Sequence, residues 1–112
     1  MNDQKKNRIV KSNHEFQKII GKKRFIKNNL FVVYFNKKED DFLRYGISVG
    51  KKLGNAVLRN RAKRQVRMMM RTNLNALCNL KVDLIIMVRK DFIDNPYENS
   101  CKSLLKILQD IR

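Results

Sequence analysis

The chain offers few residues for acid–base or nucleophilic catalysis. Its 112 residues contain one histidine, His14, and two cysteines, Cys78 and Cys101. A zinc site needs four ligands in a recognisable arrangement, and these three residues do not supply one. We expect both thiols to be reduced and at least partly buried, and the His14 side chain to be solvated in the first turn of a helix. The sequence therefore predicts no catalytic residue and no metal site.

Positive charge is the chemistry that the sequence does offer. The formal net charge is +16, from 26 Lys and Arg residues against 10 Asp and Glu residues. Such a surface attracts polyanions, so nucleic acid is the first partner to consider and an anionic membrane surface the second. No apolar run approaches the roughly 18 residues that span a bilayer, and no signal peptide is visible at the start. We expect a cytoplasmic protein with no membrane partner.

The basic residues are concentrated where acidic residues are missing. No acidic residue lies between Asp41 and Asp83, whereas this stretch contains ten basic residues: Arg44, Lys51, Lys52, Arg59, Arg61, Lys63, Arg64, Arg67, Arg71 and Lys81. A helix that needed charge only for solubility would interleave Glu with Lys. Since unpaired like charges cost helix stability, the pattern favours a polyanionic partner. The alternative is a basic face that is merely solvated.

The type of cation gives a second indication. Between Leu58 and Arg71 there are five Arg and one Lys, whereas the rest of the chain has fifteen Lys and five Arg. Guanidinium presents a rigid fork of donors that matches phosphate, while ammonium is a point charge. On a helix of about 100° per residue, the cations lie opposite an apolar stripe. That stripe consists of Leu58, Ala62, Val66 and Met69.

Hydrophobic periodicity predicts the elements that position these cations. A first helix is expected at 12–20, with Ser12 and Glu15 as a capping box and Gly21 ending it in a left-handed conformation. Short apolar runs predict strands at 25–27, Leu30–Phe35, Leu43–Val49 and Val82–Val88, the second and third joined by a hairpin loop at 37–41. The long basic helix starts at Ala56. A last helix opens at Pro96, with one apolar face formed by Tyr97, Cys101, Leu104, Leu108 and Ile111.

This order predicts a single α/β (α+β) domain over residues 1–112, with helices packed on a small sheet. In Leu30–Phe35, alternate side chains point to opposite faces, so Tyr34 and Phe35 are expected on different sides. Asn55 has two interpretations, as the N-cap of the basic helix or as a contact to RNA. Phe16 also has two: it packs in the core, or it stacks on unpaired bases together with Tyr34.

The run from Gly50 to Arg67, GKKLGNAVLRNRAKRQVR, closely resembles the signature of the bacterial ribonuclease P protein subunit. The Arg59-Asn60-Arg61 core matches the signature position for position. The similarity also includes the region around Phe16 and the segment Val82–Lys90, and it covers nearly the whole chain.

The resemblance implies a fold and a function. Helix, three strands, helix, strand and helix would follow one another, with a left-handed β-α-β crossover against the usual right-handed rule. Family members bind a large catalytic RNA, and together they remove the 5′ leader of precursor tRNA. The RNA and its Mg²⁺ ions carry out the chemistry. The protein would thus be the auxiliary subunit of a ribonucleoprotein endoribonuclease, with no bound cofactor and no further protein partner.

The resemblance also assigns roles to residues. Contact with the catalytic RNA is implied for Lys51, Lys52, Asn55, Arg59, Asn60, Arg61, Lys63, Arg64 and Arg67. A cleft for the single-stranded leader is implied at Phe16, Ile20, Tyr34 and Lys90. Ile20 departs from the family, since many members carry a second aromatic residue at that position. The alternative function, a ribosome-associated structural RNA-binding protein, fits the charge but not the spacing from Arg59 to Arg67.

Overall fold

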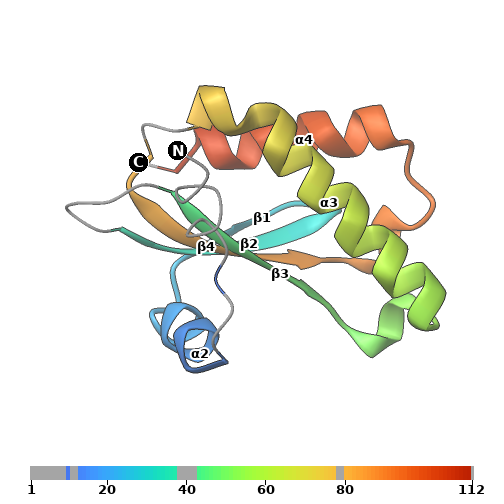
Figure 1. Cartoon of the computed structure of the whole chain (residues 1–112), viewed down its shortest axis with the longest axis horizontal. Coiled ribbons are helices and arrows are strands. Elements are labelled where there is room, and N and C mark those ends of the chain that lie inside the picture. Colours follow the sequence, from blue (N-terminus) through green and yellow to red (C-terminus); the bar gives the residue numbers. More distant parts are fainter. Residues whose placement is uncertain (1–9, 11–12, 38–42, 78–79, 112) are drawn as a thin grey trace.

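The computed structural model describes residues 10, 13–37, 43–77 and 80–111. Within them, helices and strands follow one another in the predicted order, and Figure 1 shows their arrangement. The elements are α2 (Asn13–Gly21), β1 (Phe25–Lys27), β2 (Phe31–Lys37), β3 (Arg44–Val49), the 3-10 helix η1 (Lys51–Leu53), α3 (Ala56–Leu77), β4 (Val82–Val88), the 3-10 helix η2 (Lys90–Phe92) and α4 (Tyr97–Gln109).

The four strands form one mixed sheet in the order β1-β2-β4-β3. β2 is antiparallel to both β1 and β4, whereas β3 runs parallel to β4. α3 and α4 lie on one face of the sheet and the short α2 lies on the other (Figure 1). The predicted α+β domain with helices packed on a small sheet is confirmed.

The predicted hairpin between β2 and β3 is wrong. β4 lies between these two strands and pairs with both, so they are not neighbours in the sheet. The physical reason is the composition of β4, VDLIIMV, which is apolar toward both faces and almost fully buried. Such a strand belongs at the centre of a sheet that is covered on both sides. The loop residues 38–42 lie outside the described part of the chain.

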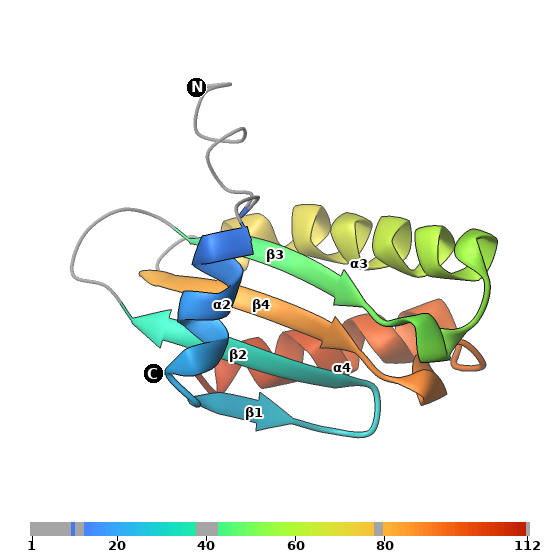
Figure 2. The ribbon, with the colours of Figure 1, turned by 90° about the horizontal axis from the view of Figure 1, so that it is seen from below.

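The connection from β3 through α3 to β4 is left-handed. In Figure 2, β3 and β4 both run from left to right, with α2 in front of the sheet and α3 behind it. The chain leaves β3, returns along α3 and enters β4 on the side toward β2. Seen from the α3 side with the strands pointing up, this path moves to the left. The crossover implied by the family resemblance is therefore present, against the common right-handed rule.

The main core lies between the sheet and the pair α3 and α4. The predicted stripe of α3 is confirmed at Ala62, Val66 and Met69, which are at most 1 % exposed, whereas its first residue, Leu58, is half-buried. Met70 is also fully buried. Along β2 the predicted alternation holds: Phe31, Val33 and Phe35 pack in this core, whereas Tyr34 packs on the α2 side.

Three details at helix ends differ from the predictions. Gly21 does not end α2 in a left-handed conformation; Lys23 does, with a φ of 58°, after the amides of Lys22 and Lys23 bond back to the last turn. Pro96 precedes α4 instead of starting it, because its ψ of 142° is extended. Tyr97 is the first residue of α4 and is 38 % exposed, so it does not belong to the buried face of that helix. Ser12, the predicted cap of α2, lies outside the described residues.

Candidate RNA interface

Asn55 caps the helix that carries the basic motif. Its side-chain oxygen Oδ1 accepts a hydrogen bond from the backbone N–H of Leu58 at 3.0 Å. Just before it, Gly54 adopts a φ of 145°, and a Cβ added there would lie 2.7 Å from Cδ1 of Leu58. Glycine is thus required both by the backbone conformation and by the close approach of Leu58. Of the two interpretations of Asn55, the N-cap is confirmed, and the RNA contact stays a prediction.

Substitution of Asn55 can distinguish its role as a helix N-cap from a contact with RNA. Asn55→Ala removes both, and loss of the cap should lower the free energy of unfolding by about 0.5–2 kcal/mol. Asn55→Ser keeps a side-chain oxygen that accepts from the Leu58 amide, so we expect it to restore the melting temperature but not the affinity for RNA. Thermal melting and RNA titration of both variants check this. Full recovery of RNA affinity in Asn55→Ser would show that Asn55 is a cap and nothing more.

The predicted RNA-contacting residues lie on η1, at Asn55 and on the first half of α3. Most of their side chains are exposed: Lys51, Lys52, Asn55, Asn60, Arg61, Arg64 and Arg67. Arg59 and Lys63 are half-buried. Among the residues that the structure describes, none of the α3 cations forms an ion pair. The positive charge of this helix is therefore not neutralised within the described fold.

Arg59 is distinct among the cations of α3. Its Nε atom is buried and has no hydrogen-bond partner within the described structure. A buried donor without a partner costs about 1–3 kcal/mol, so such atoms are uncommon in folded proteins. The shielded Nε shows that the stem of Arg59 is packed against the protein.

The predicted leader-cleft residues lie on the other face of the sheet, beside α2. Phe16 and Ile20 of α2 and Tyr34 of β2 pack around a small cluster of Val10, Ile19 and Ile85. All three are half-buried, so each keeps part of its side chain exposed. Phe16 and Tyr34 therefore pack on the sheet and keep part of their surface exposed, and stacking on unpaired bases stays a prediction. Lys90 is exposed in η2, beyond the end of β4, and is not part of this cluster.

A glycine in β3 allows α2 to lie close to the sheet. A Cβ added at Gly46 would lie 2.5 Å from Cζ and 2.8 Å from Cε2 of Phe16. The Phe16 ring therefore occupies the space that any other residue at position 46 would need for its side chain. In register, Gly46 pairs with Ile85, and Ile85 pairs with Tyr34. Phe16 and Tyr34 thus lie at the same level across the sheet, at the paired residues Gly46, Ile85 and Tyr34.

An ion-pair network holds the N-terminal part of α2. The Arg44 guanidinium on β3 donates from Nη2 to Oε2 of Glu15 at 2.6 Å and, through Nε and Nη2, to both carboxylate oxygens of Asp83 at 3.0 Å. The bonds to Asp83, and then those to Glu15, raise the pKa of Arg44. The guanidinium therefore stays charged and links α2 to two strands. This network could not be predicted from the residue pattern, because it depends on the parallel register that places Arg44 opposite Asp83.

Phe25 is a second residue that the sequence prediction missed. It lies on the edge strand β1 opposite Tyr34, and the centroids of the two rings are 5.3 Å apart with planes inclined at 45°. The Phe25 side chain is 46 % exposed. The residue pattern of β1 could not identify it. Which side chains of an edge strand point to which face of the sheet is known only once the partner strand and the register are known.

The remaining side chains considered for chemistry are placed apart from these surfaces. His14 is exposed on α2, as expected. Cys101 is a free, half-buried thiol on α4, with Nδ2 of Asn73 3.6 Å from its Sγ. Cys78 lies outside the described residues. In the described part of the chain, no helix is long and apolar enough to cross a membrane.

Comparison with known proteins assigns the fold and the motif to one family. The family model described as Ribonuclease P matches residues 4–112. The ribonuclease P protein component of Mycoplasma mycoides is 46 % identical over 108 residues, which cover 96 % of this chain and 99 % of the relative. That of Bacillus cereus strain 03BB102 is 40 % identical over 106 residues, covering 94 % of this chain and 91 % of the relative.

Solved structures agree with the sequence relatives. The RNase P protein of Staphylococcus aureus superposes with a TM-score of 0.81 at 38 % identity, covering 91 % of this chain and 93 % of the other. The RNase P protein of Thermotoga maritima gives 0.83 at 29 % identity, covering 92 % and 96 %. The predicted resemblance is confirmed, and the chain belongs to the bacterial ribonuclease P protein family, whose members assist an RNA subunit in removing 5′ leaders from precursor tRNA.

Proposed function

We propose that the chain uses its two faces for two different RNAs. The basic surface of η1 and α3 binds the RNA subunit, and the surface beside α2 binds the single-stranded leader of precursor tRNA. The observation that carries the first assignment is the arginine-rich face of α3, which lies opposite a buried stripe and is not neutralised within the described fold. Phosphates supply the missing counter-charge, and guanidinium groups bind them with defined geometry.

The leader assignment is supported by partly exposed aromatic rings on a positively charged protein. Single strands bind where aromatic side chains stack on bases and cations contact the backbone. Phe16 and Tyr34 provide rings over one row of the sheet, and Ile20 provides an apolar contact without a ring. Phe25, next to Tyr34, extends this surface to the edge of the sheet. Lys90 lies apart from the rings, and we assign to its ammonium group a contact with the phosphates of the leader.

The proposed division of labour leaves the hydrolysis to the RNA subunit. Mg²⁺ is then required by the RNA, and the protein itself needs no cofactor and no further protein partner. The protein's contribution is to neutralise phosphates and to hold the leader, which raises the affinity of the holoenzyme for its precursor. We place this activity in the cytoplasm, where precursor tRNA is found.

The purified protein alone should therefore cleave no precursor tRNA. Added to its cognate RNA subunit, it should lower the Mg²⁺ concentration needed for cleavage or raise the affinity for the precursor. Cleavage assays with RNA-free protein, with RNA alone and with both test this at several Mg²⁺ concentrations. Sustained cleavage by rigorously RNA-free protein would place the chemistry in the chain and overturn the proposal.

The RNA that co-purifies with the tagged protein tests the alternative of a ribosome-associated protein. We expect one dominant species, the catalytic RNA. Recovery of ribosomal RNA in its place would support the structural role and contradict the assignment of the α3 surface.

A further inference from the structure

A pocket of about 220 Å³ lies between the first turns of α3 and the segment that leads into α4. Both helices lie on the face of the sheet opposite α2 (Figure 1). One wall comes from the first turns of α3, the helix that carries the basic motif. The other wall comes from the segment that leads into α4, Ile93 to Tyr97. Clefts for drug-sized ligands are usually about 300–1,000 Å³, so this pocket suits a smaller, compact group. We call it the α3–α4 pocket.

Part of the lining is apolar and includes an aromatic ring. Leu58 and Ala62 of α3 and Ile93 and Pro96 on the other side supply aliphatic surface. Tyr97, the first residue of α4, adds its ring and is 38 % exposed. The Tyr97 phenol is uncharged at physiological pH, and burial raises its pKa further. This combination suits a flat, uncharged ring system that stacks on Tyr97.

The polar lining suits a ligand attached to phosphate. Arg61, from the Arg59-Asn60-Arg61 motif, places a guanidinium at the pocket, and its side chain is exposed. Gln65 and Asn95 add amide groups, each of which can both donate and accept hydrogen bonds. A nucleobase has a flat apolar face, hydrogen-bonding edges and a phosphodiester on either side.

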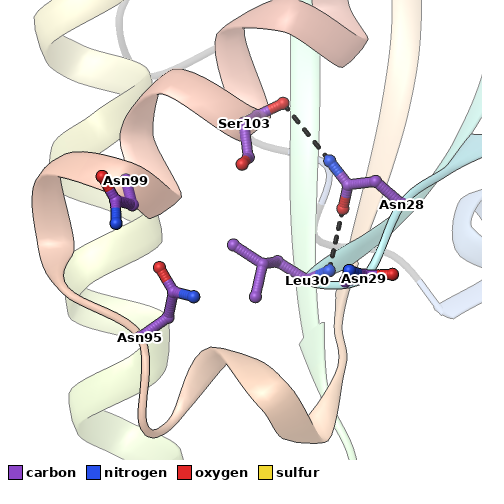
Figure 3. Close-up of a pocket in the computed structure, with 6 residues that line it drawn as sticks. All are labelled: Asn28, Asn29, Leu30, Asn95, Asn99 and Ser103. Atoms are coloured by element: carbon purple, nitrogen blue, oxygen red, sulfur yellow. Dashed lines mark hydrogen bonds between the residues drawn. The ribbon is translucent and has the colours of Figure 1, made fainter.

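A neighbouring pocket differs from the α3–α4 pocket in the side chains that line it. It has a volume of about 290 Å³, and its lining, drawn in Figure 3, contains neither a charged side chain nor an aromatic ring. The side chain of Asn28 in this pocket is already committed, because its Oδ1 accepts from the amides of Leu30 and Phe31 and its Nδ2 donates to the carbonyl of Ser103. These hydrogen bonds stabilise the turn between β1 and β2, and the second pocket has no ring on which a base could stack.

We propose that the α3–α4 pocket accepts one unpaired nucleobase of the RNA subunit, stacked on Tyr97, while the adjoining phosphates contact Arg61. This inference rests on the proposed function, in which α3 faces the RNA subunit. In this proposal the pocket binds a base that projects from the RNA, whereas the rest of the α3 surface contacts phosphates. Base stacking does not depend on counterion release, so the two kinds of contact respond differently to salt.

Affinity for the RNA subunit alone, measured over a salt titration, tests the proposal. Tyr97→Ala should weaken binding about 5- to 150-fold, the range for loss of one stacked base, with the slope of log K against log salt unchanged. Tyr97→Phe keeps the ring and should bind nearly as the parent protein does. Arg61→Ala should instead reduce the slope by about one unit. Parent-like binding by Tyr97→Ala, with the expected change in Arg61→Ala, would overturn the base pocket and leave the phosphate surface intact.

A fluorescence experiment keeps the proposal testable if Tyr97→Ala folds poorly. The chain has no tryptophan, so Tyr97→Trp introduces a single fluorophore at the pocket. Stacking on a base should quench its emission when the RNA subunit is added, whereas Phe25→Trp, on the opposite face of the sheet, should change little. Unchanged emission from Tyr97→Trp at saturating RNA would overturn the proposal. Quenching by precursor tRNA but not by the RNA subunit would also overturn it, since the base would then come from the substrate.

If Arg61→Ala changes neither the affinity nor the salt slope, Arg61 contacts no phosphate and the base pocket fails. The proposed contact of α3 with the RNA subunit fails only if the other exposed arginines of the helix are silent in the same titration. The salt slope thus separates failure of this inference from failure of the proposed function.

Discussion

Replacing the four exposed arginines of α3 together should remove a large part of the salt dependence of RNA binding. Arg61, Arg64, Arg67 and Arg71 are exposed and free of ion pairs within the described residues. Each phosphate contact contributes roughly 0.7–0.9 to the slope of log K against log salt, so the alanine variant should lose about three to four units. Between 50 and 200 mM salt, the parent protein should therefore lose roughly a hundredfold more affinity than the variant.

The variant should still fold, and this follows from the burial pattern of the helix. The substituted side chains lie away from the core stripe of Ala62, Val66 and Met69. Removing like charges from one helix also relieves repulsion between neighbouring turns. We expect a melting temperature at or above that of the parent.

Two controls separate charge, geometry and position. Substituting four exposed lysines on other elements, Lys18, Lys22, Lys102 and Lys106, with alanine removes the same net charge from α2, α4 and the turn after α2, and should leave the slope nearly unchanged. Substituting the four arginines with lysine should keep the slope but weaken binding, since ammonium cannot form the bidentate contact. A normal slope in the quadruple alanine variant would mean that the arginine face of α3 is merely solvated.

The secondary structure was largely predictable because it depends on local patterns. The apolar stripe of α3 and the strand Val82–Val88 follow from spacing alone, and both are confirmed. Strand pairing was not predictable in this way. The short loop after β2 indicated a hairpin, but the competing requirement to bury β4 on both faces placed that strand between β2 and β3.

The candidate site was predictable where it is a linear motif and not where it depends on register. The basic residues from Lys51 to Arg67 are contiguous in sequence, so their spacing predicted a common surface. The network of Arg44, Glu15 and Asp83 joins three elements and exists only in the parallel register of β3 and β4. Phe25 and Tyr97 were missed as surface rings for the same reason, since their exposure is decided by what the rest of the fold leaves uncovered.

The leader surface should discriminate precursor from mature tRNA, and Tyr34 is the most direct test. In the assembled holoenzyme, Tyr34→Ala should weaken binding of precursor tRNA by about 1–3 kcal/mol, or roughly 5- to 150-fold, through the loss of one base stack. Affinity for mature tRNA, which has no leader, should hardly change, and neither should affinity for the RNA subunit. Tyr34→Phe keeps the ring and serves as the control. Phe25→Ala should act in the same direction, since its ring adjoins Tyr34.

Phe16 needs a separate control because it also supports the fold. Its ring packs against Gly46 and Ile85, which are paired on neighbouring strands. Phe16→Ala should therefore lower the melting temperature as well as the affinity for the precursor. Complete truncation of a buried Phe costs about 3–5 kcal/mol, and the half-buried ring here should cost less. The ratio of precursor to mature tRNA affinity, taken with the melting temperature, separates the two effects. A constant ratio with lowered melting would show that Phe16 is a core residue only.

A gain of binding gives the strongest test, because damage to the fold cannot explain it. Ile20 lies one helical turn after Phe16 and is half-buried beside the same cluster. Ile20→Phe places a ring where a base can stack, so it should raise the ratio of precursor to mature tRNA affinity, up to about tenfold for a well-placed stack. Ile20→Leu changes the shape without adding a ring and should leave the ratio as it is. Equal ratios for both variants, at unchanged melting temperature, would show that the leader does not pass over this part of α2.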